Sequence, residues 1–595
     1  MEAPASGPVD GETVLDVTRS ATGRVWRPRL DDSRIAQAIA QAAGVPEIVG
    51  RILAARGVGP ETAEDFLNPS LRALLPDPSG FRDMDAACAR LAAAIMNQEP
   101  VTVFGDYDVD GATSAALLAR FFRAAGSDIS IYVPDRMKEG YGPNAAALRS
   151  IAASGARVVI TVDCGTLAYD ALAAGSAAGL DLIVADHHMA EPRLPDVLAV
   201  VNPNRLDESG QCSELAAVGV VFLVVVAVNR ILRDRGWYDS RPEPDLLQWL
   251  DLVALGTVCD VVPLTGLNRA FVQQGLKVTA ARRNAGIVAL ADVAAVHETI
   301  GTYHLGFLLG PRVNAGGRIG HADFGARLLS TDDHGEAERL ARDLDAWNVE
   351  RRAIEALILE EALAQAEAQE DAPVIVVSDP SWHPGVVGIV ASRLKDKYRR
   401  PAVVIGYGDG IGKGSARSVP GFDIGAAVIA ARQAGLLING GGHAMAAGLT
   451  IDGAKIPELS LHLADRGRAA GTETGAEDRL GIDGALAVSG ATRELVEVLE
   501  QAGPYGAGNK EPRFALAEAR IVRADIVGTG HVRCIFAGPA GGRVKGILFN
   551  GADGDLGKFL LGRGAAPVHV AGRLRADNWQ GRQDVQFMID DAAAA

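Results

Sequence analysis

Residues 101–113 read VTVFGDYDVDGAT, an apolar run followed by alternating acids and a glycine. The apolar run predicts a buried strand over Val101–Phe104, and the alanine-rich sequence after the glycine predicts a helix over Ala112–Ala124. The acids are Asp106, Asp108 and Asp110. Three carboxylates this close together repel one another unless cations bind between them. This stretch therefore predicts a strand that ends at a cation site.

The same alternation of strand and helix continues along the chain. Further apolar runs predict strands at 129–133, 158–162, 182–185 and 197–201, with a helix such as 143–153 between two of them. This alternation predicts a mostly parallel sheet covered by helices on both faces. Chemistry-bearing residues follow several apolar runs: Asp163, Asp186, His187, His188 and Asp260. Because strand ends in an open α/β sheet meet in one crevice, we expect these side chains to lie together.

The ligand types predict which metal binds. Carboxylates with one or two imidazoles suit Mn²⁺, with Mg²⁺ a weaker fit, rather than a thiolate zinc site. The supply of carboxylates exceeds the need of one ion, so we expect two ions roughly 3.5–4 Å apart that share an aspartate. A calcium loop of the EF-hand type is the alternative for D-x-D-x-D-G. This alternative is excluded because an EF-hand loop needs a glutamate at its twelfth position, which here is Leu117. It also needs a preceding helix, whereas a strand is predicted here.

Composition limits the class of protein. The 595 residues exceed one hydrophobic core, and 48% hydrophobic with 22% charged residues is typical of globular proteins. A net charge of −16 excludes a general nucleic-acid coat, although residues 481–595 are balanced, with 13 basic and 13 acidic residues. Five cysteines without a C-x-x-C pair, no signal peptide and no long apolar run predict a cytoplasmic protein without a membrane segment.

The pattern predicts an α/β fold with several parts. We expect a mainly helical segment at 1–80, a parallel-sheet domain at 81–330, a connecting helix at 331–372, a second, smaller α/β domain at 373–470 and a small β-barrel at 475–595. The connector could equally be an ordinary surface helix of one lobe. In the barrel, arginines alternate with aromatics, and Trp579 in the turn-like DNWQG could stack on a base, as in OB-type single-strand binders.

The motifs DYDVDG, VDCGT, ADHH and the later Asp260 resemble the DHH phosphoesterase family. The strings GPRVNAGGR, GKGSARS, GGGHAMAAG and PYGAGNKEP resemble its RecJ branch over roughly residues 80–590. The resemblance implies an exonuclease that degrades single-stranded DNA from the 5′ end to mononucleotides, with Mn²⁺ or Mg²⁺, in recombination and repair. It also implies a monomer that works with a single-strand-binding protein and a RecQ-type helicase.

The resemblance assigns a role to each candidate ligand. Asp108 and Asp163 would hold one ion with help from Asp106, whose role is the least defined because many relatives have histidine near this position. Asp110, Asp163, His187 and Asp260 would hold the other ion, with Asp163 bridging. His188 would face the substrate phosphate as a hydrogen-bond donor or general acid, and Asp186 would orient its neighbours.

Phosphate contacts are expected outside the metal site. The resemblance implies that Arg136, Arg312 and Arg318, the last two flanking an NAGG turn, grip the 5′-terminal phosphate with Ser415 and Arg417. Any one of these arginines alone could be a paired surface group. The run Gly440, Gly441, Gly442, His443 could present backbone N–H groups to a phosphate or could be a plain tight turn.

Two other functions fit the same motifs. The first is a DHH phosphoesterase acting on short oligonucleotides, cyclic dinucleotides or pyrophosphate, which would not need a C-terminal barrel. The second is a non-enzymatic replication scaffold of DHH ancestry, which would not need the complete ligand set that this sequence keeps.

Overall fold

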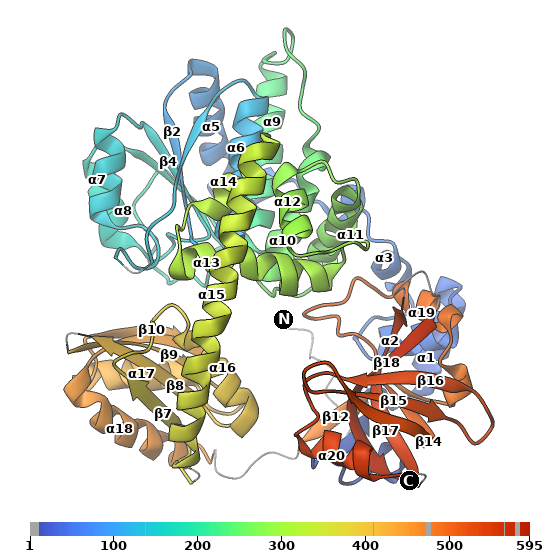
Figure 1. Ribbon diagram of the computed structural model, residues 1–595. Coiled ribbons are helices and arrows are strands. Elements are labelled where there is room, and N and C mark those ends of the chain that lie inside the picture. Colours follow the sequence, from blue (N-terminus) through green and yellow to red (C-terminus); the bar gives the residue numbers. More distant parts are fainter. Residues whose placement is uncertain are drawn as a thin grey trace. The chain divides into compact units, whose positions relative to one another are not determined.

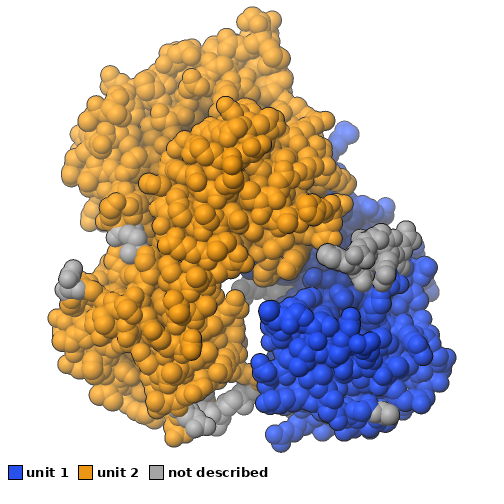
Figure 2. All heavy atoms as spheres, in the orientation of Figure 1, with its two compact units in different colours: residues 1–76, 261–274, 477–595 blue, residues 77–260, 275–476 orange. Residues whose placement is uncertain are grey.

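The computed structural model describes residues 11–136, 138–369, 371–408, 410–471, 478–564, 566–577 and 584–595. These residues form two compact units (Figure 2). Unit 1 contains the described residues of 11–76, 261–274 and 478–595, and unit 2 contains those of 77–260 and 275–471. No helix among the described residues has both the length and the apolar character needed to cross a membrane.

Unit 2 begins with the predicted parallel sheet, whose strand order is β3-β2-β4-β5-β6. Its strands are β2 (Val101–Gly105), β3 (Ile129–Tyr132), β4 (Val158–Val162), β5 (Asp181–Ala185) and β6 (Ala199–Val201). Its helices are α5 (Met84–Asn97), α6 (Val109–Ala124), α7 (Ala145–Ala153), α8 (Tyr169–Ala177) and α9 (Ala217–Asp234). The predicted α/β class is confirmed.

The connections of this sheet create a crevice beside the acidic motif. Helices α7 and α8 cover one face, while α5, α6 and α9 cover the other (Figure 1). The chain leaves β2 for one face through α6 and leaves the neighbouring β4 for the opposite face through α8. Where adjacent strands send their helices to opposite faces, a crevice opens at their carboxyl ends, and α/β proteins bind ligands there.

A group of helices follows the sheet. These are α10 (Leu250–Cys259), α11 (Gly266–Ala280), α12 (Ala285–Val293), the π-helical turn η4 (His304–Leu309), α13 (Gly310–Ile319) and α14 (Phe324–Ser330). The long helix α15 (His334–Glu367) packs on α12, α13 and α14 near its start and on α16 and β7 near its end, as Figure 1 shows. It therefore connects the two lobes of unit 2.

The second lobe of unit 2 has a mixed sheet of order β10-β11-β9-β8-β7. Its strands are β7 (Ile375–Asp379), β8 (Ala402–Gly408), β9 (Ile411–Arg417), β10 (Asn439–His443) and β11 (Ala446–Asp452). Its helices are α16 (Val387–Tyr398), α17 (Ile424–Gln433) and α18 (Ile456–Ala469).

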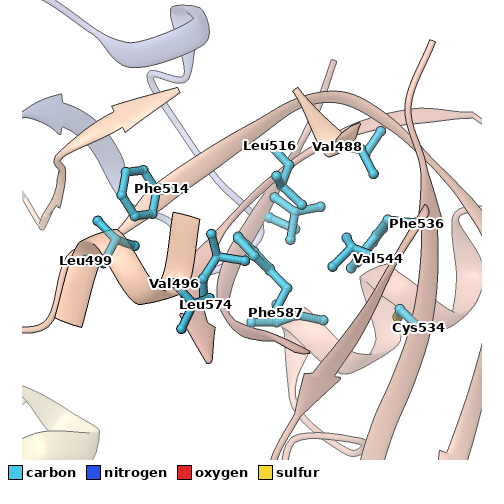
Figure 3. Close-up of a cluster of buried hydrophobic side chains, with 14 of the residues drawn as sticks. Val488, Val496, Leu499, Phe514, Leu516, Cys534, Phe536, Val544, Leu574 and Phe587 are labelled. Atoms are coloured by element: carbon cyan, nitrogen blue, oxygen red, sulfur yellow. The ribbon is translucent and has the colours of Figure 1, made fainter. Parts of the chain in front are cut away.

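Unit 1 contains a closed barrel, in which β14 pairs with both β15 and β17. The closed ring contains β14 (Phe514–Val527), β15 (His531–Ala537), β16 (Arg543–Leu548), β18 (Asp584–Ala594) and β17 (Pro567–Asp577), while the short strand β13 (Gly484–Leu486) pairs in parallel with β14 outside the ring. The helices α19 (Arg493–Glu500) and α20 (Asp555–Gly562) accompany the barrel. Figure 3 shows the core of this unit, where Phe514, Phe536 and Phe587 are fully buried.

The N-terminal segment packs onto this barrel and shares its core. Strand β1 (Val25–Pro28) pairs in parallel with β12 (Arg479–Ile482). The buried Trp26 donates its indole N–H to the carboxylate of Asp591 at 3.0 Å. The helices of this segment are α1 (Ser33–Ala43), α2 (Glu47–Ala54), α3 (Ala63–Leu67) and α4 (Leu71–Leu74). Among the described residues, five further short helical turns lie at Val14–Asp16, Pro78–Gly80, Leu246–Trp249, Gly453–Lys455 and Val488–Gly490.

Two local predictions are wrong. The NAGG sequence is not a turn but part of helix α13, because its glycines pack against other backbone: a Cβ at Gly317 would lie 2.7 Å from the carbonyl oxygen of Tyr107. The run 440–443 is not a tight turn but lies within strand β10, where Gly441 pairs with Gly448, and its contact with a phosphate stays a prediction. Trp579 lies outside the described residues.

Candidate metal centre

The three aspartates of the first motif lie where β2 runs into α6. Asp108 is the N-cap of α6, and its Oδ1 accepts the N–H groups of Asp110 at 2.9 Å and Gly111 at 3.2 Å. Gly111 approaches the strand end so closely that a Cβ there would lie 2.4 Å from the carbonyl oxygen of Asp106. This tight strand-to-helix turn gathers three carboxylates at the carboxyl end of β2.

Asp163 follows β4, the neighbour of β2. Its φ of 59° lies in the left-handed region, which few residues other than glycine adopt. The turn is held by its N–H, which donates to the carbonyl oxygen of Ala185 at 3.1 Å, and by the hydroxyl of Tyr141, which donates to the Asp163 carbonyl at 3.0 Å. Strained backbone of this kind is concentrated at functional sites, and here it directs a buried carboxylate into the crevice.

The start of helix α9 fixes the carboxylate of Asp110. Its two oxygens accept the backbone N–H groups of Ala217 at 2.6 Å and Val218 at 2.9 Å. The N-cap of α9 is Ala216, which has no polar side chain, so Asp110 caps this helix from α6. Asp110 is consequently buried and rigid, with lone pairs left over on each oxygen.

His187 has a defined tautomer. Its Nδ1 lies 3.0 Å from the carbonyl oxygen of Leu215, and a carbonyl can only accept, so Nδ1 carries the proton. The lone pair of Nε2 faces three carboxylates, at 3.3 Å from Asp163, 3.6 Å from Asp260 and 4.0 Å from Asp110. Asp260, which was predicted to follow a strand, is instead the C-cap of helix α10, because the apolar run before it forms a buried helix. An imidazole held through one nitrogen to a backbone carbonyl, with the other free, is the usual arrangement of a metal ligand.

His188 is paired with the buried Asp186 instead. Its Nδ1 lies 2.8 Å from Asp186 Oδ1, and Asp186 also accepts the N–H groups of His187 and Thr166. Burial alone would lower the pKa of His188, but the hydrogen bond and charge of Asp186 outweigh it and raise that pKa. Burial would likewise raise the pKa of Asp186, but its hydrogen bonds and the charge of His188 hold that pKa well below its usual range.

The ligand-type atoms form overlapping groups in which all atoms lie within 4.8 Å of one another. One group contains Asp106, Asp108 and Asp163. A second contains Asp110, His187 and Asp260, and a third contains Asp163, His187 and His188. Three buried atoms of this cluster lack a hydrogen-bond partner among the described residues: Asp106 Oδ1, His187 Nε2 and Asp260 Oδ2. Because unpaired buried polar atoms are costly, these atoms fit a site that divalent cations fill.

The electrostatics of the cluster lead to the same inference. Burial, then the charge of Asp108, raises the pKa of Asp106 and Asp163 well above the usual range. Burial and the charges of Asp260 and Asp108 raise the pKa of Asp110, and burial with Asp108 raises that of Asp260 to about 7. Without cations the carboxyl groups of this cluster therefore resist full ionisation. Bound cations would offset both the burial of the carboxylates and their mutual repulsion.

Cationic side chains lie next to the acidic cluster. The guanidinium of Arg136 lies 5.0 Å from the ring centre of Tyr107, and its charge partly opposes the rise in the pKa of Asp106 that burial and Asp108 cause. Burial, followed by the charge of Arg136, lowers the pKa of Arg318 to about 10 and also lowers that of Arg417. Arg417 lies in β9 and donates to the hydroxyl of Ser415 at 3.2 Å. The structure thus brings together Arg136, Arg318, Ser415 and Arg417.

The other residues predicted to contact phosphate, Arg312 and residues 441–443, lie outside this group of cationic side chains. Arg312 is engaged by α15, because its Nε donates to Asp345 at 2.8 Å and it also bonds the carbonyl of Leu308. Gly441, Gly442 and His443 lie on β10, an edge strand of the second lobe. Neither feature is part of the acidic cluster.

Several supporting residues were missed by the sequence analysis. Asn202 follows β6 and donates to the Thr166 hydroxyl at 2.9 Å and to the His188 carbonyl at 2.8 Å. Asn204 donates to the carbonyl of His187. The hydroxyl of Tyr141 lies 3.4 Å from both ring nitrogens of His188. In the sequence VVNPNR, Asn202 and Asn204 directly follow a predicted strand, as Asp163 does. This position at a strand end could have identified them as part of the site.

The sequence of this chain also matches known protein families and known proteins. The DHH family, N-terminal domain, matches residues 100–257, the DHHA1 domain matches 371–466, and the RecJ OB domain matches 482–591. The single-stranded-DNA-specific exonuclease RecJ of Salmonella typhimurium is 36% identical over 92% of this chain and 96% of its own length. The chain belongs to the RecJ family.

Other RecJ proteins also match this chain in sequence and in structure. RecJ of Escherichia coli is 35% identical over 92% of this chain and 96% of its own length. The crystal structure of RecJ from Thermus thermophilus in complex with Mn²⁺ matches this RecJ-family chain with a TM-score of 0.79 and 30% identity, over 95% of this chain and 78% of that one. The same protein in complex with Mg²⁺ matches with a TM-score of 0.72 and 29% identity. The predicted family is therefore confirmed.

Proposed function

We propose that this protein is a metal-dependent exonuclease that degrades single-stranded DNA in the 5′→3′ direction to 5′-mononucleotides, in DNA recombination and repair. The observation that carries the proposal is the cluster of five aspartates and His187 at the carboxyl ends of β2, β4 and β5 and the end of α10, with three of its buried atoms left without protein partners. Membership of the RecJ family, whose relatives are named single-stranded-DNA-specific exonucleases, supports the substrate class.

The proposed ligands divide into two sets that share Asp163. Asp106, Asp108 and Asp163 would hold one ion, and Asp110, Asp163, His187 and Asp260 would hold the other. Mn²⁺ or Mg²⁺ suits these oxygen-rich sets, and two such ions would supply Lewis-acid stabilisation of the phosphodiester and a water of lowered pKa. The relatives solved with Mn²⁺ and with Mg²⁺ support this choice of metals.

The side chains around the ions have separate tasks. Asp186 holds the imidazole of His188 through a 2.8 Å hydrogen bond and raises its pKa, which positions His188 to donate a hydrogen bond or proton to the phosphodiester. Arg136, Arg318 and Arg417 gather positive charge beside the acids, with Ser415 as a neutral donor. We propose that this group binds the 5′-terminal phosphate, because forked guanidinium groups match phosphate oxygens.

The two other functions considered above have less support. The match to the RecJ OB domain over residues 482–591 disfavours an enzyme limited to small substrates. The complete set of ligand-type side chains disfavours a scaffold that has lost its metals. We further propose that the protein is a monomer in the cytoplasm that works with a single-strand-binding protein and a RecQ-type helicase. Co-sedimentation with each purified partner would test those interactions.

Digestion of end-blocked oligonucleotides tests the function. With Mn²⁺ present, we expect a 3′-blocked single strand to be degraded to mononucleotides, a 5′-blocked strand to survive and a blunt duplex to be resistant. The Asp163→Asn variant is the control for contaminating nucleases. Degradation of the 5′-blocked strand with survival of the 3′-blocked strand would reverse the proposed direction, and absence of digestion of any strand would refute the function.

A further inference from the structure

Two stacked aromatic rings are exposed at the π-helical turn η4. Phe307 is 71% exposed and Tyr303 is 47% exposed. Their ring centres lie 5.3 Å apart, with 24° between the ring planes. The widened turn of a π-helix places residues four apart nearly above one another, and such turns are frequent at functional sites. An exposed aromatic pair stacked on itself presents a flat apolar face to a ligand.

This turn packs beside the end of helix α10, whose C-cap is Asp260. A Cβ at Gly306 would lie 3.4 Å from a methyl group of Val258. The thiol of Cys259, which directly precedes Asp260, lies 3.4 Å from the carbonyl oxygen of Leu305. Thus η4 touches the two residues before a proposed metal ligand.

The same helical run reaches the first acidic motif at its other end. Turn η4 continues directly into α13, where Gly317 packs against the backbone of Tyr107, between Asp106 and Asp108. Ten residues separate Phe307 from Gly317, which corresponds to about 15 Å at 1.5 Å per residue. At about 3.4 Å per stacked nucleotide, this length equals a few nucleotides of a single strand.

We propose that Phe307 and Tyr303 form a stacking platform for a base of the single-stranded DNA, a few nucleotides away from the bond that is cut. The inference rests on the proposed function, because only a strand that enters the metal site brings a base to this distance. Stacking on an aromatic ring tolerates every base, since each base has a π face. The platform therefore suits an enzyme that holds its strand without reading its sequence.

Steady-state kinetics on an oligo-dT strand with Mn²⁺ test the platform. We expect Phe307→Ala to raise KM about five- to tenfold with little change in kcat, and Tyr303→Ala to have a smaller effect in the same direction. Leu357→Ala is the matched control, because Leu357 is 65% exposed on α15 and should leave both constants unchanged. Unchanged KM in Phe307→Ala, with normal hydrolysis by the wild type, would overturn the platform but not the function.

Affinity for strands that contain one abasic site distinguishes loss of the stacking platform from a general structural defect. A single abasic site is placed at successive positions of the strand. We expect the wild type to bind the strand more weakly when the abasic site stands at one particular position, where the missing base would stack. At that position the abasic site should not weaken binding by Phe307→Ala. An equal additional loss for the variant at every position would overturn the proposal.

Binding measurements separate the platform from the reaction. Fluorescence anisotropy of a labelled strand in EDTA should show the same weakening in Phe307→Ala, even if the wild type did not hydrolyse DNA. Sedimentation of both proteins tests the other possible occupant. A change from dimer to monomer in Phe307→Ala, with DNA binding unaltered, would make the pair an interface between copies and overturn the proposal.

Discussion

Asp163 belongs to two of the three ligand groups, and its surroundings oppose its ionised form. Burial and the charges of Asp108, Asp110, Asp106 and Asp260 all raise its pKa. A carboxyl whose folded pKa is raised lowers stability as pH rises through that pKa. Asp163 therefore reduces the stability of the metal-free protein at pH 8.

Asp163→Asn should separate stability from activity. Asparagine has the same shape and tolerates a positive φ, so the fold should persist. In EDTA at pH 8 we expect the Tm of the variant to lie about 2–4 °C above that of the wild type, because one repelling charge is lost. With Mn²⁺ the wild type should gain stability while the variant gains little and cuts no DNA. A variant that cuts at the wild-type rate would remove Asp163 from the metal site.

Asp260 should make metal binding depend on pH. Because burial and Asp108 raise its pKa to about 7, a proton competes with the metal below that pH. We expect the apparent Kd for Mn²⁺ to rise about tenfold or more per pH unit as the pH falls below 7, because Asp106, Asp110 and Asp163 also have a raised pKa and can hold further protons. Calorimetry in two buffers of different ionisation enthalpy would measure the released proton. An affinity that stays constant from pH 6 to pH 8 would contradict this account.

At the scale of elements, the contact of α13 with the first motif positions the acids. Gly317→Ala should favour the helix intrinsically, yet its Cβ would lie 2.7 Å from the Tyr107 carbonyl and displace the backbone between Asp106 and Asp108. We expect kcat to fall about 10- to 100-fold with the fold intact, as measured by hydrolysis and circular dichroism.

Gly301→Ala is the matched control for this substitution. Gly301 precedes the same helical run, and a Cβ there would meet only the His304 ring at 3.9 Å. Its activity should equal that of the wild type. An equal loss in both variants would show that the effect comes from the helix rather than from the contact with Tyr107.

The elements that the sequence predicts well are those whose signal is local. The apolar run Val158–Val162 has the same bounds in the structure as in the prediction, because a fully buried strand needs uninterrupted apolar side chains. The glycines of α13 misled the prediction because close packing, rather than a turn, requires them. The carbonyl of Leu215 and the amide of Asn202 act through long-range contacts, so no local pattern reveals their roles.

At the scale of the whole molecule, unit 1 depends on both ends of the chain. Ile39, Ile52 and Leu53 of the N-terminal helices share one core with Val496 and Phe514 of the C-terminal part. Each such side chain contributes about 1.5–3 kcal/mol when buried. The two ends should therefore fold together or not at all.

A chain ending at residue 471 tests this dependence. We expect trypsin to digest residues 11–76 rapidly in the shortened chain and slowly in the full chain, because the partners in the core are lost. The full chain with Ile438→Ala, an exposed residue of unit 2, is the control for unspecific effects. Equal protection of residues 11–76 in both lengths would show that the N-terminal segment folds by itself.

Anomalous diffraction from crystals soaked in Mn²⁺ tests the central claim most directly. The account predicts two peaks. One should lie among Asp106, Asp108 and Asp163, and the other among Asp110, Asp163, His187 and Asp260. Only the second peak should require the free Nε2 of His187, so His187→Ala should weaken that peak more than the first. The absence of any peak at this cluster, or manganese bound only elsewhere, would contradict the account.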